Sequence, residues 1–354
     1  MTKAPSQFSK DVLRTLESLG IETKANEAMN TTQAGTGGNF VPTIMSQNIV
    51  KKARLTSKIM SSLPEENIIT MPSNPYTHPV EGADMNWNLT GEQTDYPATE
   101  VTKSQPGTAL MTFNAKKLSA SVVISAEEEE DALIAGGIQS YVENKFAVSY
   151  KELIEKLIIN GDTRVTGSTN VNAIDGAVTA AAYYLAQDGM VRNAQANTAT
   201  LDVGTLDSGD FRSLRKLLGK KGADPSKLIC IPTLDTYYKM LSLAQVETME
   251  KFGVNATIKD GVLSTIDGMM VCPNPDFLNG QAGGYVGTAS NTLGRFLVAY
   301  LPEIFVGFKR EMKMVVEYYG KTDQYILTAH VRIAVQMANT ASLGTCAMGY
   351  NIPV

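Results

Sequence analysis

The sequence predicts an α+β fold built from one long helix, long β-strands and an extended segment that leaves the compact region. In residues 138–159, apolar side chains recur three or four positions apart, as on one face of a helix about 33 Å long. In residues 325–337, apolar and polar side chains alternate strictly, which is typical of a strand with one buried face. Residues 65–115 show no helical period and are rich in proline and glycine.

Length and charge restrict the class of protein. The chain has 354 residues, enough for one large or two to three ordinary domains with a hydrophobic core. Lys and Arg number 31 against 36 Asp and Glu, so the net charge is −5, whereas a general nucleic-acid binder carries a basic excess. No apolar run is long enough to cross a bilayer, and the first 21 residues lack the pattern of a secretory signal. We therefore expect a soluble protein that stays in the cytoplasm of the cell that makes it.

The N-terminal residues predict a short helix on a flexible arm. Apolar side chains recur at helical spacing in residues 6–19, and the polar, glycine-rich residues 30–39 follow. The apolar stripe of this helix requires a partner surface. The compact region is expected to open at residue 40.

Residues 65–115 form the most unusual segment. Apolar residues 68–71 and 110–113 predict two strands, and the long stretch between them has no helical period. Loops of this length without structure are rare in compact domains unless they are disordered or functional. Tyr76, Trp87 and Tyr96 favour order, because disordered tracts are poor in aromatic residues. We interpret the segment as a two-stranded excursion that packs on another molecule.

Residues 116–162 predict a strand followed by two helices. Apolar side chains alternate with serines in residues 118–124, which indicates a half-buried strand. Ser125 and Glu128 have the spacing of a capping box, and the acidic residues 127–131 lie at the positive end of the helix dipole. A cation site is the alternative interpretation of this acidic run, but capping is the simpler one. The long helix 138–159 follows.

The middle of the chain predicts an α/β region, and its end predicts strands. After a polar loop that reaches residue 207, we expect a basic helix at 211–221, a strand at 228–231 and a helix at 234–243. Short strands are expected at 269–272, 285–286 and 296–298, and two longer ones at 313–318 and 325–337.

The sequence carries no recognisable catalytic or cofactor motif. Its two histidines, His78 and His330, accompany neither a G-x-S-x-G element nor a Cys/His signature, and no phosphate-binding glycine pattern is present. Cys230, Cys272 and Cys346 stand far apart, which favours buried thiols over zinc ligands or disulfides. We expect no catalytic residue, no cofactor and no metal. An α+β hydrolase with a carboxylate pair is the alternative, because such pairs are fixed in space rather than in sequence.

Two segments carry opposite charge. Residues 1–60 contain eight basic and four acidic residues, a net charge of +4, whereas residues 65–115 contain seven acidic residues and one lysine, a net charge of −6. This pattern fits an ordinary solvated surface, or two arms that dock on each other in neighbouring copies. Under the second hypothesis the candidate contact residues between subunits are Lys51, Lys52, Arg54, Glu81, Asp84, Trp87, Glu92, Asp95 and Glu100.

The order of these elements resembles the major capsid proteins of tailed double-stranded DNA bacteriophages, which share the Hong Kong ninety-seven fold. The resemblance covers residues 37–349, from an opening motif to the terminal strand pair that contains Arg332. The matching pieces are Gly37-Gly38-Asn39-Phe40-Val41-Pro42, the excursion 65–115, Lys116-Lys117-Leu118 through Ser125-Ala126-Glu127, Glu130-Asp131, the helix that ends in Asn160-Gly161-Asp162, and Asp267-Gly268-Met269-Met270-Val271.

The resemblance implies a domain organisation and a function. It implies an N-terminal arm (1–36), a peripheral P-domain with the long spine helix (37–64 and 116–162), an extended E-loop (65–115), an axial A-domain (163–300) and P-domain strands that return (301–354). The implied function is a head protein that self-assembles, as hexamers and pentamers, into an icosahedral shell around phage DNA. The DNA would be enclosed without sequence-specific binding, and no membrane would be involved. An encapsulin-like protein nanocage is the alternative within this fold.

The resemblance also implies partners and a location. Scaffolding, portal and decoration proteins are the expected partners, and the expected location is the virion, after assembly in the host cytoplasm. Some relatives carry a long N-terminal scaffolding region that a protease removes, whereas only residues 1–36 precede the opening motif here. Scaffolding is therefore expected to be a separate protein or to be absent. Some relatives also cross-link a lysine of the E-loop to an asparagine of a neighbour, and nothing assigns that role to Lys103 or Asn351.

Overall fold

Two β-sheets organise the part of the chain that the structure describes. The structure is a computed structural model, and it describes residues 59–89, 102–131, 137–243, 246, 258–259, 262–288, 290–340 and 343–354. All of these residues belong to one of the two units into which the chain divides, the unit of residues 51–132 and 136–354. The helix expected at 6–19 and the glycine-rich arm lie outside the described residues.

The first sheet has four strands, in the order β1 (Ile68–Thr70), β12 (Ile304–Tyr319), β13 (Gln324–Met337) and β4 (Lys116–Ser125). Strands β12, β13 and β4 are antiparallel, and β1 runs parallel to β12. The long strand expected at 325–337 is confirmed, and its partner expected at 313–318 is longer, with 16 residues. The bulges of β12 near Arg310 interrupt its alternation, which is why the sequence pattern revealed only its second half.

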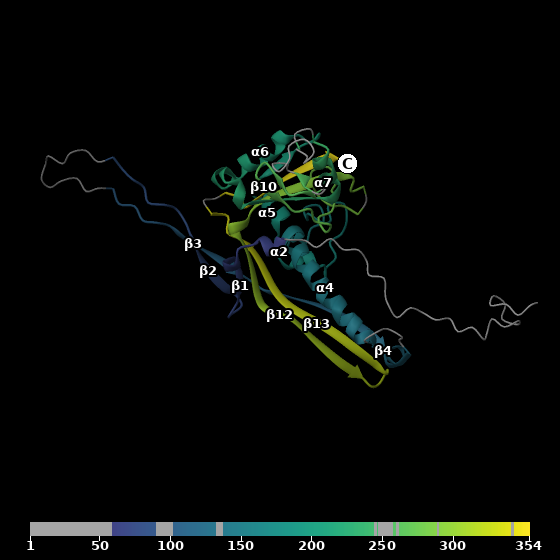
Figure 1. Ribbon diagram of the computed structural model, residues 1–354. Helices are drawn as coiled ribbons and strands as arrows, with labels where there is room; N and C mark the ends of the chain where they lie inside the picture. The colour runs from purple at the N-terminus through teal and green to yellow at the C-terminus, as the bar shows by residue number, and fades with distance from the viewer. Residues whose placement is uncertain are drawn as a thin grey trace, which may run out of the picture. The chain divides into compact units, whose positions relative to one another are not determined.

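The long helix α4 (Gly137–Asn160) covers one face of this sheet (Figure 1). Phe146 of α4 packs with Ile124 of β4 and with Leu327 and Ala329 of β13. The short helix α3 (Ala126–Asp131) precedes it, and the backbone N–H of Glu128 donates to Ser125 Oγ at 3.1 Å. The expected long helix and the expected cap are therefore confirmed.

Strand β4 confirms the strand expected at 118–124, and the face of the sheet opposite α4 is exposed, but the side of β4 toward α4 is less buried than expected. Ile124 is buried, but Val122 and Val123 are exposed. Alternation places Val123 on the face away from α4. An apolar side chain on that face has no cover among the described residues.

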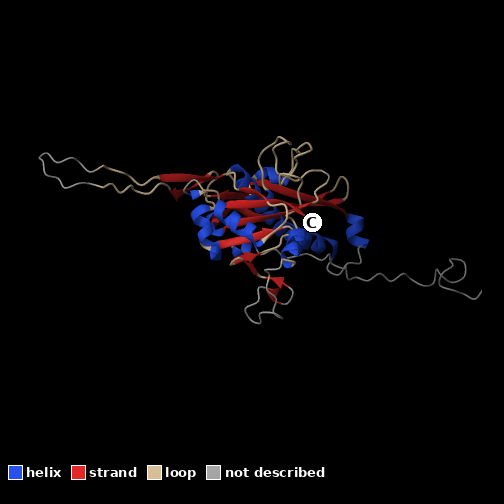
Figure 2. Cartoon of the chain, turned by 90° about the horizontal axis from the view of Figure 1, so that it is seen from above, coloured by secondary structure: helices blue, strands red, loops and turns tan. Residues whose placement is uncertain are grey.

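The second sheet has six strands and is covered on both faces. Its strands, in spatial order, are β5 (Thr200–Asp202), β14 (Cys346–Pro353), β11 (Leu293–Tyr300), β6 (Leu228–Pro232), β10 (Met269–Val271) and β9 (Thr265–Ile266). Helices α6 (Ser208–Leu217) and α7 (Leu234–Leu241) pack on the face of Phe296, and α5 (Met190–Ala196) packs on the face of Leu297. Figure 2 shows helices on either side of the strands.

The middle and the end of the chain differ from expectation at three points. The polar loop expected up to residue 207 contains α5 and β5. Residues 285–286 are not a strand, because Val286 exchanges backbone hydrogen bonds with the loop residues Val171 and Ile174. Strand β14 was not expected, and it takes the end of the chain into the six-stranded sheet.

The remaining elements are short. They include helix α2 (Ile59–Ser62), which buries Ile59, and the strand pair β7 (Ile258–Lys259) and β8 (Val262–Leu263). Among the described residues, no helix is both long and apolar enough to cross a membrane. The three cysteines are buried, as expected, and burial raises the pKa of the Cys230 thiol.

A buried ion pair joins two of the connections between the sheets. Glu303 lies where β11 continues into β12, and Lys221 Nζ donates to its Oε2 at 2.6 Å. The same carboxylate accepts hydrogen bonds from Thr340 and Thr345, in the segment that connects β13 to β14. Lys221 also donates to the carbonyl of Leu343 at 2.8 Å. One carboxylate thus holds together the connections from β11 to β12 and from β13 to β14, two of the three points at which the chain passes from one sheet to the other.

Candidate assembly surfaces

The expected two-stranded excursion is confirmed over its described residues, although its pairing differs. Strand β2 (Tyr76–Glu81) pairs antiparallel with β3 (Thr108–Phe113), whereas the strand expected at 68–71 is β1, which pairs with β12. The pattern of β2 was hidden by Pro79, a residue tolerated only at sheet edges and bulges. We call the paired residues 76–89 and 102–113 the ribbon (Figure 1).

The base of the ribbon belongs to the core of its own chain. Phe113 and Met71 are buried and pack with Ala334 of β13. The Tyr76 ring lies 6.1 Å from the Phe113 ring, and Tyr76 is half-buried. The interpretation that this segment packs on another molecule is therefore wrong for Tyr76, because the partner of Tyr76 is Phe113 of the same chain. Tyr96 lies outside the described residues.

Hydrogen bonds hold the ribbon together beyond the end of β2. Gly82 N donates to the carbonyl of Gly107 at 3.0 Å, and Gly107 N donates to that of Ala83 at 2.7 Å. A Cβ on Gly82 would lie 2.7 Å from the backbone of Gly107, so this close approach requires glycine. Further along, Ser104 Oγ bridges the N–H and the carbonyl of Asn86. The two chains therefore remain side by side as far as these residues.

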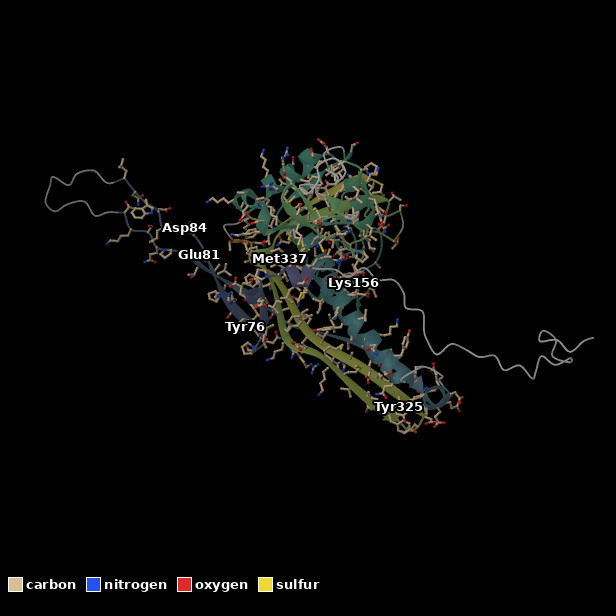
Figure 3. The ribbon with its side chains drawn as sticks, viewed as in Figure 1. Tyr76, Glu81, Asp84, Lys156, Tyr325 and Met337 are labelled. Atoms are coloured by element: carbon tan, nitrogen blue, oxygen red, sulfur yellow. The ribbon has the colours of Figure 1, made fainter. Side chains whose placement is uncertain are left out.

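The distal ribbon exposes apolar and acidic side chains. Trp87, the single tryptophan, is 96% exposed, Met85 is 58% exposed, and Leu89 is fully exposed. Glu81 and Asp84 are exposed and have no ion-pair partner among the described residues; Figure 3 shows their side chains on the ribbon. Exposed large apolar side chains next to charged ones are typical of protein-interaction sites.

The structure locates three of the nine candidate contact residues. Glu81, Asp84 and Trp87 lie together on the distal ribbon. The other six lie outside the described residues: Lys51, Lys52, Arg54, Glu92, Asp95 and Glu100.

A second surface, which the sequence interpretation missed, lies on the four-stranded sheet. We call the face opposite α4 the outward face. Arg310, Arg332 and Lys117 are direct neighbours across β12, β13 and β4, and Lys313 lies beside His330 in the next row. The alternation of β13 already placed Arg332 and His330 on one face. The rows became visible only once the register of three strands was known.

The described residues contain no group of three or more His, Cys, Asp or Glu side chains that could hold a metal ion. His330 and His78 lie on different elements, and neither has a nucleophile as a hydrogen-bond partner among the described residues. The chemical groups of both surfaces are suited to binding another macromolecule.

Solved structures with this arrangement of elements come from phages and from a GTA particle. A chain of Microbacterium phage Oxtober96 superposes with a TM-score of 0.61 at 14% identity, covering 89% of this chain and 98% of its own length. A chain of the capsid of the native GTA particle superposes with a TM-score of 0.62 at 14% identity, covering 92% of this chain and 99% of its own length. A chain of Mycobacterium phage Cain superposes with a TM-score of 0.60 at 15% identity, covering 91% of this chain and 98% of its own length. The shared fold is that of a capsid subunit.

The family model of the phage capsid family matches residues 37–220, which is more than half of the chain. The chain belongs to this family, and it is a structural major capsid protein. No curated protein sequence matches it. The Hong Kong ninety-seven fold that the order of elements implied is confirmed.

Proposed function

We propose that this chain builds an icosahedral head around phage DNA, and that the ribbon makes the contact between copies. The observation that supports the ribbon's role is the exposure of Met85, Trp87 and Leu89 beyond a base that is buried in its own subunit. Apolar side chains held in water by an ordered ribbon gain free energy when a neighbour covers them. The ribbon is therefore a preformed contact element.

The mechanism is geometric. Each subunit makes several modest contacts, and closed symmetry multiplies them into a shell that is far more stable than any single interface. A net charge of −5 suits a container that must not trap the DNA that it encloses. The proposed assembly units are hexamers and pentamers, formed in the host cytoplasm, with portal, scaffolding and decoration proteins as partners. We assign the chain no catalytic role.

The charge of the ribbon guides its docking. Glu81 and Asp84 carry negative charge beside the apolar tip, and the basic residues Lys51, Lys52 and Arg54 of a neighbouring copy are one proposed counterpart. Complementary charge selects one docking geometry among many. Because exposed pairs are screened by salt, assembly is expected to weaken as ionic strength rises.

The test uses the full chain and its single tryptophan. Purified protein, concentrated alone or with a candidate scaffold, should form hollow particles or ring-shaped capsomers in electron micrographs. The emission of Trp87 should shift to shorter wavelength at the same time, because the indole is exposed in the free subunit. A subunit that stays monomeric under all these conditions contradicts the shell. Particles that form with unchanged Trp87 emission contradict the role of the ribbon.

A further inference from the structure

A gap under helix α4 divides the core that joins this helix to the four-stranded sheet. Phe146 of α4 packs with Ile124 and Leu327 in one cluster of buried side chains. Leu157, about three turns further along α4, belongs to a separate cluster that contains Val331 of β13. Close packing is interrupted between the two clusters, which leaves a space between the helix and the sheet.

The gap has a volume of about 220 Å³ and is lined mainly by apolar side chains. Phe146 and Leu153 of α4 border it about two helical turns apart, which is about 11 Å along the helix axis. Met312 of β12, Ala329 of β13 and Leu118 of β4 border it on the side of the sheet. The gap therefore spans three strands under one segment of the helix.

Small side chains leave this space open. Ala329 is buried on β13, and its direct neighbour on β4 is Ala120, so both residues lie on the face toward α4. Ser149 stands one turn after Phe146, where the spacing of a core-facing helix calls for an apolar residue. A larger apolar side chain at any of these three positions would fill part of the gap. The sequence of this subunit therefore leaves room here for atoms that it does not supply itself.

Two tyrosines hold the borders of the gap in place. The backbone N–H of Met312 donates a hydrogen bond to the hydroxyl of Tyr150, which ties α4 to β12. Tyr183 belongs to the short 3-10 helix η3 (Tyr183–Ala186), which lies against both α4 and β4. A space with fixed borders binds a ligand without the cost of first being opened.

The chemistry of the lining selects an uncharged aromatic ligand. Among the described residues that border the gap, none is Asp, Glu, Lys or Arg, so a charged ligand would lose its hydration without gaining a counter-charge. Burial raises the pKa of both Tyr150 and Tyr183, which keeps their hydroxyls neutral at physiological pH. These two rings and Phe146 can pack edge-to-face on an aromatic ring, and the sulfur of Met312 favours the same kind of partner.

The volume of the gap sets the size of this ligand. An apolar cavity of about 150 Å³ holds one benzene molecule, so about 220 Å³ has room in proportion for about nine non-hydrogen atoms. A helix or a strand of a partner protein is far larger than this, because a helix alone is about 10 Å across. The occupant that fits is therefore a free small molecule.

We propose that the gap between α4 and the four-stranded sheet binds an uncharged aromatic molecule of the size of indole, with its ring between Phe146 and Leu153 and over Ala329. The bound ring joins the two clusters of buried side chains and fastens α4 to the sheet. The site lies on the face of the sheet opposite the outward face. The inference is therefore independent of the proposed shell contacts of the ribbon.

The experiment titrates the full-length, unassembled subunit with indole and follows binding by ligand-observed NMR and by thermal melting. Indole should bind saturably, with a Kd of about 0.1 to 1 mM for a ligand of this size. At ten times Kd it should raise the melting temperature by about 2 °C, because it binds only the folded subunit. The charged analogue indole-3-acetate should bind at least about tenfold more weakly, because nothing in the lining offsets its charge.

Two variants fill the gap, and one matched variant leaves it open. Ala329→Leu fills it from its buried side and Ala120→Ile from its exposed side, so each should weaken indole binding by about tenfold or more. The control Ala109→Ile makes the same substitution on an exposed residue of β3 and should leave binding unchanged.

The remaining outcomes overturn the inference. Absence of saturable binding up to the solubility of indole does so, and so does binding that survives both gap-filling variants or that is lost equally in Ala109→Ile. Indole-3-acetate that binds as tightly as indole contradicts the uncharged lining as the basis of selection. If Ala329→Leu fails to melt cooperatively, the exposed Ala120→Ile variant decides the result alone.

Discussion

The two sheets of this subunit differ in how completely they are covered. In the six-stranded sheet, all five residues of β6 are buried, and helices cover both faces. In the four-stranded sheet, α4 covers one face, and the outward face leaves Val123 and Val315 exposed. The six-stranded region completes its core within the chain. The four-stranded region has an unfinished surface, which in a capsid protein is where neighbours are expected to attach.

The two sheets also differ in whether a half-buried or buried arginine finds hydrogen-bond partners within the subunit. Arg295 of β11 is fully buried, yet its guanidinium donates to the carbonyls of Leu278 and Gly284 and lies 4.6 Å from the Phe277 ring. Its burial lowers its pKa to about 9. Arg332 of β13 lies between two other cations and has no such partner among the described residues. A charge satisfied inside the subunit supports folding, whereas an unsatisfied one on the surface is available for assembly.

The largest effect is expected from shortening the ribbon, which should abolish assembly and leave folding intact. Replacing residues 83–106 by Asn-Gly joins Gly82 to Gly107, which already share a backbone hydrogen bond and suit a two-residue hairpin turn. Because the core contacts of Tyr76 and Phe113 remain, the shortened subunit should melt cooperatively near the temperature of the full chain. It should form no shells in electron micrographs.

The control for this deletion keeps the length of the ribbon. The triple variant Met85→Ser, Trp87→Ser and Leu89→Ser retains the backbone but removes the exposed apolar area, so assembly should weaken without being abolished. A shortened subunit that unfolds would show that the distal ribbon belongs to the core of its own chain.

The next effect concerns the junction between the two sheets. Glu303→Ala leaves Lys221 buried without its counter-charge, which should lower the free energy of unfolding by about 3 to 5 kcal/mol. Chemical denaturation of the unassembled subunit measures this loss. The double variant Lys221→Met and Glu303→Leu removes both charges and should recover most of the stability. Equal losses in the single and double variants would contradict the ion pair as the cause.

Long periodic elements could be predicted from the sequence because their pattern is local. Helix α4 and strand β13 each repeat one pattern over many residues, and both were predicted within a residue or two at each end. Strand β14 was not predicted because Gly349, Asn351 and Pro353 interrupt its alternation, and its identity depends on β11 and β5 lying beside it. Tertiary pairing, rather than local preference, makes this segment a strand.

The candidate surfaces could be predicted only in part. Composition was enough to identify an acidic, aromatic ribbon, and Glu81, Asp84 and Trp87 do lie together on it. The cationic rows on the outward face depend on a bulge of β12 between Arg310 and Lys313, which adds one residue relative to β13. Strict alternation from Arg310 would place Met312 opposite His330, whereas the observed register places Lys313 there. The rows therefore follow from the register and not from the sequence pattern.

A smaller effect on stability is expected from removing a helix cap in each of the two regions. Asp207 caps α6 in a capping box with Asp210, and α6 buries Phe211 and Leu214 in the core of the six-stranded region. Asp207→Ala should therefore lower the free energy of unfolding by about 1 kcal/mol. Ser125 caps α3, which buries no side chain, so Ser125→Ala should cost less in the same denaturation experiment. A larger loss for Ser125→Ala would show that α3 supports the fold more than its burial indicates.

The smallest effect is the titration of His330, and it reports directly on the charge of the outward face. Burial, followed by the charges of Lys117 and Arg310, lowers the pKa of His330 from its ordinary value of 6.5. The folded subunit therefore binds this proton at lower pH than the unfolded chain does. Its contribution to stability is complete above the ordinary pKa and is lost as the pH falls toward the lowered folded value.

The measurement is simple because the chain has only two histidines. In a His78→Gln variant, the remaining imidazole resonance of the unassembled subunit should titrate below pH 6.5. Lys117→Gln removes one of the two charges that lower the pKa, so the titration should move upward, whereas the distant exposed Lys216→Gln should leave it unchanged. A titration that does not respond to Lys117→Gln would contradict the electrostatic link between His330 and the cationic rows and would leave burial as the cause of the lowered pKa.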